Sequence, residues 1–255
     1  MPGLLEVHRL TKRFGGVQAV ADVSFSVLPG TIYAVIGPNG AGKTTLFNLV
    51  SGYLAADSGD VWFDGRSIRG WPVHRIARAG LTRTFQNLEP FPGMTVLENV
   101  MVGCDAHVRC TWLDALFGTR RRRAANAASR AEAHRLLSLF SLDHMADVPV
   151  EALPYGMQRL VEIVRAFALR PKLLLLDEPA AGLNPAERQQ LAAVLRQARS
   201  RGVTVLLIEH DVDLVMTVAD RILVLDQGRV LAEGAPAEIQ AHPAVLAAYL
   251  GEEVS

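Results

Sequence analysis

The sequence predicts an α/β fold that combines a mixed sheet, an N-terminal antiparallel β subdomain and an inserted α-helical subdomain. Continuously apolar segments at 32–36, 173–176 and 203–208 predict buried parallel strands, because a strand covered on both faces carries apolar side chains throughout. Each segment precedes a helical pattern, as in βα units. Polar and apolar residues alternate from 4 to 27, which predicts antiparallel strands with one face toward solvent.

Length and composition favour one compound domain over residues 1–255. The chain carries 26 Lys plus Arg and 26 Asp plus Glu, and 50% of its residues are hydrophobic, which excludes a disordered chain. The net charge of +0 gives no broad attraction to nucleic acid. No apolar stretch reaches the ~18 residues of a membrane span. Cys104 and Cys110 lack metal-site spacing, so we expect reduced thiols in a cytoplasmic protein.

The predicted helical subdomain extends from about 95 to 168, where apolar residues recur at helical spacing and no strand-like segment occurs. The arginines at 120–123 are typical of a solvated surface, with a lipid or partner contact as the less frequent alternative. A further helix is predicted after Asn184, which is a favourable cap. Pro185 occupies the first helical position and Glu187 the first turn.

Two hairpins and a helical tail complete the predicted elements. Residues 61–63 precede Asp64-Gly65, a pair typical of tight hairpin turns. Residues 222–233 predict a second hairpin that turns at 226–228. From about 236 to 255 we expect a C-terminal helical tail, with its final helix beginning near Pro236.

A glycine-rich segment between a predicted strand and a predicted helix matches the phosphate-binding pattern GxxxxGK[ST]. Its glycines let successive N–H groups converge on phosphate oxygens, and the positive end of the following helix points to the same place. Lys43 supplies a cation for the β and γ phosphates, and Thr44 a hydroxyl ligand for Mg²⁺. The predicted phosphate-loop residues are Gly37, Pro38, Asn39, Gly40, Ala41, Gly42, Lys43, Thr44 and Thr45.

Polar residues near the ends of other strands are candidates for the chemistry. Asp177 is predicted to hold Mg²⁺ and Glu178 to polarise the water that attacks the γ phosphate, unless both acids merely end a strand at a solvent boundary. His210 is placed to donate to the γ phosphate, or is structural. Gln86 is placed to reach the metal or the attacking water, or is an ordinary edge residue. Phe14 is predicted to stack on adenine, with a half-buried core aromatic as the alternative.

Together these motifs resemble, in order along nearly the whole chain, the ATP-binding subunit of an ABC transporter. The segments that carry this resemblance are the phosphate loop, Gln86, 153–158, 173–178 and His210. The resemblance implies ATP and Mg²⁺ and a closed dimer, in which Pro154, Tyr155 and Gly156 of one subunit contact the nucleotide held on the other. The second ATPase subunit is a paralogue or a second copy. Two membrane permeases and a solute-binding protein acting through them are also implied, on the cytoplasmic face of the membrane, with no nucleic acid.

Finer features resemble the larger ATPase subunit of importers for branched-chain and other hydrophobic amino acids. They lie at 83–87, 94–100, 178–185 and 242–251. The same ATPase role in a transporter for urea, amides or another solute, or in an exporter, stays open as an alternative at this point. A soluble ABC ATPase acting in DNA repair or on the ribosome, and a switch that binds ATP without turnover, are the alternatives from other classes.

Residues 153–157 form the signature loop of the resembled family, and they depart from its usual sequence, LSGGQ. Pro154 replaces the serine, Tyr155 a glycine and Met157 the glutamine, and tyrosine fits the subfamily. Because proline lacks both a hydroxyl and an N–H, we expect the site completed by this loop to be weaker, by ~1–3 kcal/mol per lost charged hydrogen bond. Asn184 stands where many relatives have aspartate, and as a helix cap it does the same local job.

Overall fold

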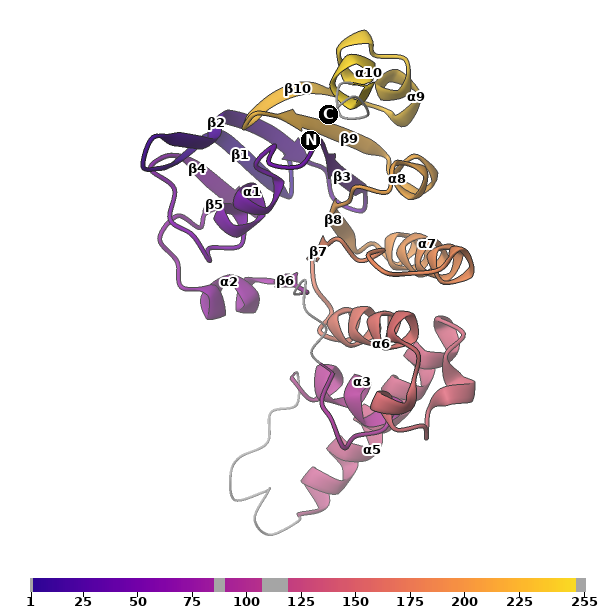
Figure 1. The fold of residues 1–255 in the computed structure, drawn as a ribbon. Coiled ribbons are helices and arrows are strands. Elements are labelled where there is room, and N and C mark those ends of the chain that lie inside the picture. Colours follow the sequence, from indigo (N-terminus) through magenta and orange to yellow (C-terminus); the bar gives the residue numbers. More distant parts are fainter. Residues whose placement is uncertain (1, 85–89, 107–118, 251–255) are drawn as a thin grey trace. The chain divides into compact units, whose positions relative to one another are not determined.

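The computed structural model describes residues 2–84, 90–106 and 119–250 and divides the chain into two compact units. The first unit contains both sheets and consists of Met1–Arg83, Lys172–Ala181 and Leu195–Ser255. The second unit is helical and consists of Thr84–Pro171 and Gly182–Val194. Figure 1 shows the sheets in indigo, purple and orange and the helices of the second unit in magenta and pink.

An antiparallel sheet of four strands, in the order β2-β1-β4-β5, begins the first unit. Its strands are β1 (Leu5–Phe14), β2 (Val17–Val27), β4 (Ser58–Phe63) and β5 (Arg66–Ser67). Leu5 and Val7 are buried in the core while Glu6 between them is more exposed, which confirms the alternating pattern. Asp64 and Gly65 have φ of 51° and 73° and form the predicted turn between β4 and β5.

A six-stranded mixed sheet, in the order β10-β9-β3-β8-β7-β6, forms the centre of the first unit (Figure 1). The strands are β3 (Ile32–Ile36), β6 (Leu81–Arg83), β7 (Leu173–Asp177), β8 (Thr204–Ile208), β9 (Arg221–Asp226) and β10 (Arg229–Gly234). All pairs are parallel except β9 with β10. Every residue of β3, β7 and β8 is buried, which confirms the predicted core strands and the mixed sheet.

The carboxyl ends of these parallel strands lie at one edge of the sheet, where α/β proteins bind ligands. The phosphate loop follows β3 and leads into α1 (Lys43–Val50), and the acidic pair Asp177 and Glu178 ends β7. Glu209 and His210 follow β8 and precede α8 (Val212–Val218). The topology thus collects three polar segments at one edge.

The helical unit packs α3 (Val96–Asp105) against both α5 (Arg120–Leu139) and α6 (Tyr155–Ala168). Two short 3-10 turns connect α5 to α6, at Asp143–Met145 and Val150–Ala152. The apolar face of α6 consists of Leu160, Ile163, Val164 and Phe167, all of which are buried. The unit also includes the beginning of α7 (Pro185–Ser200), for which Asn184 caps the first turn as predicted.

The C-terminal region differs from the prediction in one respect. The hairpin of β9 and β10 and its turn are confirmed. The prediction of one final helix from Pro236 is wrong, because the structure has two helices, α9 (Pro236–Gln240) and α10 (Pro243–Leu250). Pro243 has no N–H and disfavours a helical backbone at the preceding residue, so the helix stops before it. A further short helix, α2 (Val73–Ala79), was not predicted.

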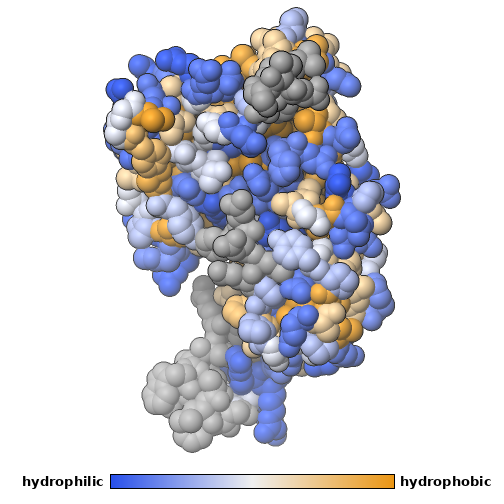
Figure 2. Space-filling view, viewed as in Figure 1, coloured by the Kyte–Doolittle hydropathy of each residue, from blue (hydrophilic) through white to orange (hydrophobic). Residues whose placement is uncertain are grey.

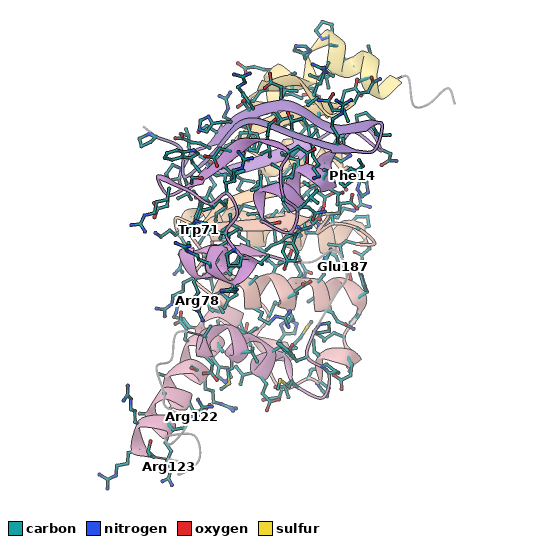
Figure 3. All side chains as sticks on the ribbon, turned by 90° about the vertical axis from the view of Figure 1, so that its left-hand side faces the viewer. Phe14, Trp71, Arg78, Arg122, Arg123 and Glu187 are labelled. Atoms are coloured by element: carbon teal, nitrogen blue, oxygen red, sulfur yellow. The ribbon has the colours of Figure 1, made fainter. Side chains whose placement is uncertain are left out.

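The surface carries mixed polar and apolar side chains (Figure 2). The arginines that begin α5 are mostly exposed, and Figure 3 shows Arg122 and Arg123 at the end of that helix. Within residues 2–84, 90–106 and 119–250, no helix is both long and apolar enough to cross a bilayer. Burial raises the pKa of the Cys104 thiol to about 11, and Cys110 lies outside the described residues.

Candidate nucleotide site

The phosphate loop joins β3 to α1 through a backbone that requires glycine. Gly37, Gly40 and Gly42 have φ of 149°, 77° and 97°, a region that residues with a Cβ rarely adopt. At two of these positions there is also no room for a side chain. A Cβ at Gly37 would overlap the carbonyl oxygen of Leu225, and one at Gly42 would overlap that of Ala19. The glycines therefore serve both the curvature of the loop and its close packing.

Lys43 places its ammonium group inside this loop. It is the first residue of α1, and its side chain is only 7% exposed. Its Nζ donates to the carbonyl oxygens of Gly37 at 2.5 Å and Pro38 at 2.9 Å. The cation is thus held at the positive end of α1, an arrangement that favours a bound anion.

A pocket of about 500 Å³ opens beside the loop. Its volume lies within the ~300–1,000 Å³ typical of small-molecule sites. The first unit alone supplies its wall, which consists of Val17, Gln18, Ala19, Asn39, Gly40, Ala41, Gly42, Lys43, Thr44, Thr45, Glu178 and Gln227. Residues that carry a cation, hydroxyl groups and a carboxylate therefore line one cavity.

Phe14 lies at the end of β1, beside this wall. It pairs with Val17, which lines the pocket, but Phe14 itself is not among the pocket residues in the described part of the chain. Its side chain is 50% exposed, and the Lys12 ammonium is 5.7 Å from its ring centroid. Figure 3 shows Phe14 at the end of the antiparallel sheet. The ring is outside the core, and stacking on adenine stays a prediction.

Asp177 forms a buried ion pair with Arg83. Its side chain is 2% exposed, and its Oδ2 accepts from Nη2 of Arg83 at 2.9 Å. The other terminal guanidinium nitrogen, Nη1, donates to Oδ1 of Asn48 at 2.7 Å and to Oγ of Ser51 at 2.9 Å. Arg83 thus ties β6, α1 and the end of β7 together. The second oxygen of Asp177 and the hydroxyl of Thr44 are hard oxygen donors of the type that Mg²⁺ prefers.

Glu178 has a left-handed backbone, with φ of 46°. Such a conformation costs ~1–3 kcal/mol in a residue with a side chain and is concentrated at functional sites. Its backbone N–H donates to the carbonyl oxygen of Ile208 at 2.9 Å, and the residue lines the pocket. Nδ1 of His210 lies 4.0 Å from Oε2 of Glu178. The structure therefore brings together the phosphate loop, Glu178 and His210.

Glu209 is a completely buried acid whose role the sequence analysis missed. Its Oε1 accepts from the backbone N–H of Ala180 at 2.7 Å, and its Oε2 from those of His210 at 3.1 Å and Asp211 at 3.3 Å. Burial raises the pKa of this carboxyl, although these N–H donors and nearby His210 oppose the shift. Glu209 thereby joins the segment after Glu178 to the segment that carries His210.

The signature loop lies in the second unit, at the beginning of α6. Pro154 precedes the helix, and its carbonyl oxygen accepts from the N–H groups of Met157 at 3.0 Å and Gln158 at 3.1 Å. Tyr155 is 48% exposed, whereas Gly156 is buried. Proline offers no capping side chain here. The loop therefore presents the N–H groups of a helix start, which carry a partial positive charge.

Other site residues were missed, or lie outside the described residues. The turn at Gln227 and Gly228 was predicted, but the place of Gln227 in the pocket wall was not. The Gly228 N–H beside it donates to the carbonyl oxygen of Ala41 at 3.0 Å. A positive φ of 46° at Gln227 is its only local peculiarity. Arg83 carried no sequence signal for its pairing with Asp177. Gln86, predicted to contact metal or water, lies outside the described residues.

Comparison with known proteins identifies the family. Residues 20–181 match the profile of the ABC transporter family, and residues 229–255 match that of the branched-chain amino acid ATP-binding cassette transporter. The chain belongs to the ABC transporter family.

Relatives of known name cover almost the whole chain. It is 45% identical over 250 residues to the high-affinity branched-chain amino acid transport ATP-binding protein BraF of Pseudomonas aeruginosa, covering 98% of each. Identity to LivG of Escherichia coli, which has the same description, is 41% with the same coverage. The probable LivG of Archaeoglobus fulgidus is 37% identical, covering 99% of this chain and 97% of the relative.

Solved structures agree in fold. A nucleotide-free ATP-binding cassette from an ABC transporter is 32% identical, with a TM-score of 0.81, covering 96% of this chain and 98% of that one. The ADP conformation of an ATP-binding cassette is 31% identical with the same TM-score, covering 98% of this chain and 100% of the other. The predicted ABC ATPase fold is confirmed.

Proposed function

We propose that this chain is the ATP-binding and hydrolysing subunit that energises import of branched-chain or other hydrophobic amino acids. The observation that supports the ATPase role most strongly is the single pocket lined by Lys43, Thr44 and Glu178. A cation beside a phosphate-binding loop and a carboxylate facing the same cavity are what ATP hydrolysis requires, because phosphoryl transfer depends chiefly on positioning and charge stabilisation.

The phosphate loop and the polar residues near the strand ends have separate roles in this proposal. The backbone of residues 37–45 holds the phosphates, and Lys43 neutralises charge on the β and γ groups. Thr44 and Asp177, with Gln86, would hold Mg²⁺, which when bound supplies further neutralisation of phosphate charge. Glu178 polarises the attacking water, which agrees with its place in the wall of the cavity.

The remaining predicted residues act at the ends of the nucleotide. His210 donates to the γ phosphate from beside Glu178. Phe14 stacks on adenine, which agrees with an exposed ring next to the pocket wall. Pro154, Tyr155 and Gly156 contact the nucleotide held on the second ATPase subunit, whether a paralogue or a second copy. Closure around two ATP molecules and reopening after hydrolysis would then drive the transport cycle.

The membrane and substrate parts of the proposal rest on the named relatives. BraF and LivG are described as branched-chain amino acid transport proteins, and they align with this chain from end to end. The match at residues 229–255 supports the same substrate class. We infer two permease subunits, a solute-binding protein acting through them, and a peripheral position on the cytoplasmic face of the membrane. In this proposal the helical subdomain and the segment 86–100 receive a cytoplasmic helix of the permease.

The test is Lys43→Ala in the complete transporter. Without its ammonium group the phosphate loop loses the charge that the β and γ phosphates need, so ATP binding and leucine uptake should both be abolished. Lys172→Ala is the matched control, because Lys172 belongs to the same unit but pairs with Asp64 at the surface. Unchanged ATP turnover in Lys43→Ala would remove the phosphate-loop assignment. Full ATPase activity without uptake of any branched-chain amino acid would remove the substrate.

A further inference from the structure

Glu187, in the first turn of α7, forms a reciprocal capping pair with Asn184. The backbone N–H of Glu187 donates to Oδ1 of Asn184 at 3.0 Å, and the backbone N–H of Asn184 donates to Oε2 of Glu187 at 2.9 Å. Such a pair satisfies N–H groups that have no partner within the helix. Glutamine serves equally well in this motif, so capping needs the side-chain oxygen but not its negative charge.

The same carboxylate lies against Gly156 of the signature loop, within the second unit. A Cβ at position 156 would overlap the Cδ and both carboxylate oxygens of Glu187. A second contact joins the same two segments, because a Cβ at Gly182 would lie 3.5 Å from the ring of Tyr155. Figure 3 shows Glu187 at the beginning of α7. The carboxylate therefore touches the first turn of α6.

Glu187 brings to this helix start a negative charge that α6 itself lacks. The first turn of α6 contains no acidic residue, and Pro154 provides no capping side chain. The N–H groups of a helix start carry about half a positive elementary charge. A carboxylate beside them is attracted to this end, and by the same Coulomb interaction it reduces the attraction that the end exerts on a second anion.

We propose that Glu187 is a positioning residue that weakens the hold of the signature loop on the phosphate of ATP bound to the partner subunit. This rests on the proposed function, in which that phosphate approaches the start of α6. Because the phosphate must approach beside a negative charge, the closed dimer reopens readily after hydrolysis. Removing the charge while keeping the cap tightens closure and slows reopening.

The experiment compares Glu187→Gln with wild type in the full-length chain with its ATPase partner. We expect the KM for ATP to fall about three- to tenfold, with a lower kcat and a melting temperature lowered by no more than about 4 °C, because the lost attraction to the helix start is small. The ATP concentration needed for half-maximal association, measured by analytical ultracentrifugation, falls by a similar factor. Both differences shrink at high salt because the effect is electrostatic. Glu187→Ala lowers the KM in the same way and lowers the melting temperature further than Glu187→Gln does, since the cap is also lost.

Glu238→Gln is the matched control. Glu238 accepts from the Ala235 N–H at 2.7 Å at the start of α9, as Glu187 does from the Asn184 N–H, and its carboxylate would overlap a Cβ at Gly234. Its neutralisation should leave the KM unchanged. Suppose that wild type shows ATP-dependent association of its subunits but the KM of Glu187→Gln equals or exceeds that of Glu238→Gln. The proposed role of Glu187 is then overturned, and the proposed dimer is not. If wild type shows no ATP-dependent association, the proposed dimer is overturned together with it.

Discussion

Arg83→Met tests how the acidic edge of the sheet is built. The substitution keeps a long apolar side chain against Phe47 and Tyr53, whose ring centroids lie 5.3 Å from the guanidinium carbon. It removes the charge that faces Asp177. The side chains of Arg83 and Asp177 are only 10% and 2% exposed, so water cannot replace the lost partner.

The expected loss in the free energy of unfolding is ~3–5 kcal/mol, the range for removing one member of a buried ion pair. The exposed pair of Arg9 and Asp22 provides the control, because its side chains are 83% and 65% exposed. Arg9→Met should change stability by less than ~1 kcal/mol. Adding Asp177→Asn to Arg83→Met should recover part of the loss, since an amide no longer leaves a buried charge without its guanidinium.

The assay is urea unfolding, followed by circular dichroism, of wild type, Arg83→Met, Asp177→Asn and their double variant. Arg9→Met is measured in the same way as the control. A coupling energy above ~1 kcal/mol between positions 83 and 177 is predicted from their contact. Additive losses at these positions, or an Arg83→Met loss no larger than that of Arg9→Met, would refute the reasoning that this ion pair holds the site together.

Two further predictions concern the signature loop and the buried acid. Pro154→Ser restores a hydroxyl, and if this regains ~1 kcal/mol of phosphate binding, ATPase activity of the assembled transporter at ATP concentrations below the KM should rise about fivefold; no change counts against a weakened site. Burial raises the pKa of Glu209 above the reference value of 4.5, so the folded state binds the proton more tightly. The stability of wild type relative to Glu209→Gln should therefore be greatest below pH 4.5 and fall as the pH rises toward the folded-state pKa, measured by thermal unfolding across this range. A difference in stability between wild type and Glu209→Gln that does not change with pH would contradict the argument that burial raises this pKa.

The features predictable from sequence are those whose signal is local. The strands β3, β7 and β8 follow from unbroken apolar segments, and the phosphate loop follows from closely spaced glycines and Lys43. The hairpin turns follow from their residue types. Each of these depends on neighbouring residues, so no tertiary contact was needed to find it.

The missed features depend on residues far apart in the sequence. Arg83 pairs with Asp177, and Glu209 binds the backbone of Ala180, because β6 to β8 lie side by side in the sheet. Glu187 was predicted only as a first-turn residue of α7, and its approach to Gly156 depends on tertiary packing. Periodicity assigns elements, whereas strand order and helix packing decide which of their polar ends meet.

The most direct test of the account is Glu178→Gln in the full-length chain with its ATPase partner. Because the amide cannot take a proton from water, we expect ATP binding to persist, hydrolysis to slow by about 10²–10⁴-fold, and a nucleotide-bound dimer to accumulate on gel filtration with ATP. Glu238→Gln should hydrolyse ATP like wild type. Wild-type turnover in Glu178→Gln, or normal hydrolysis by a species that contains one nucleotide domain throughout, would contradict the central claim.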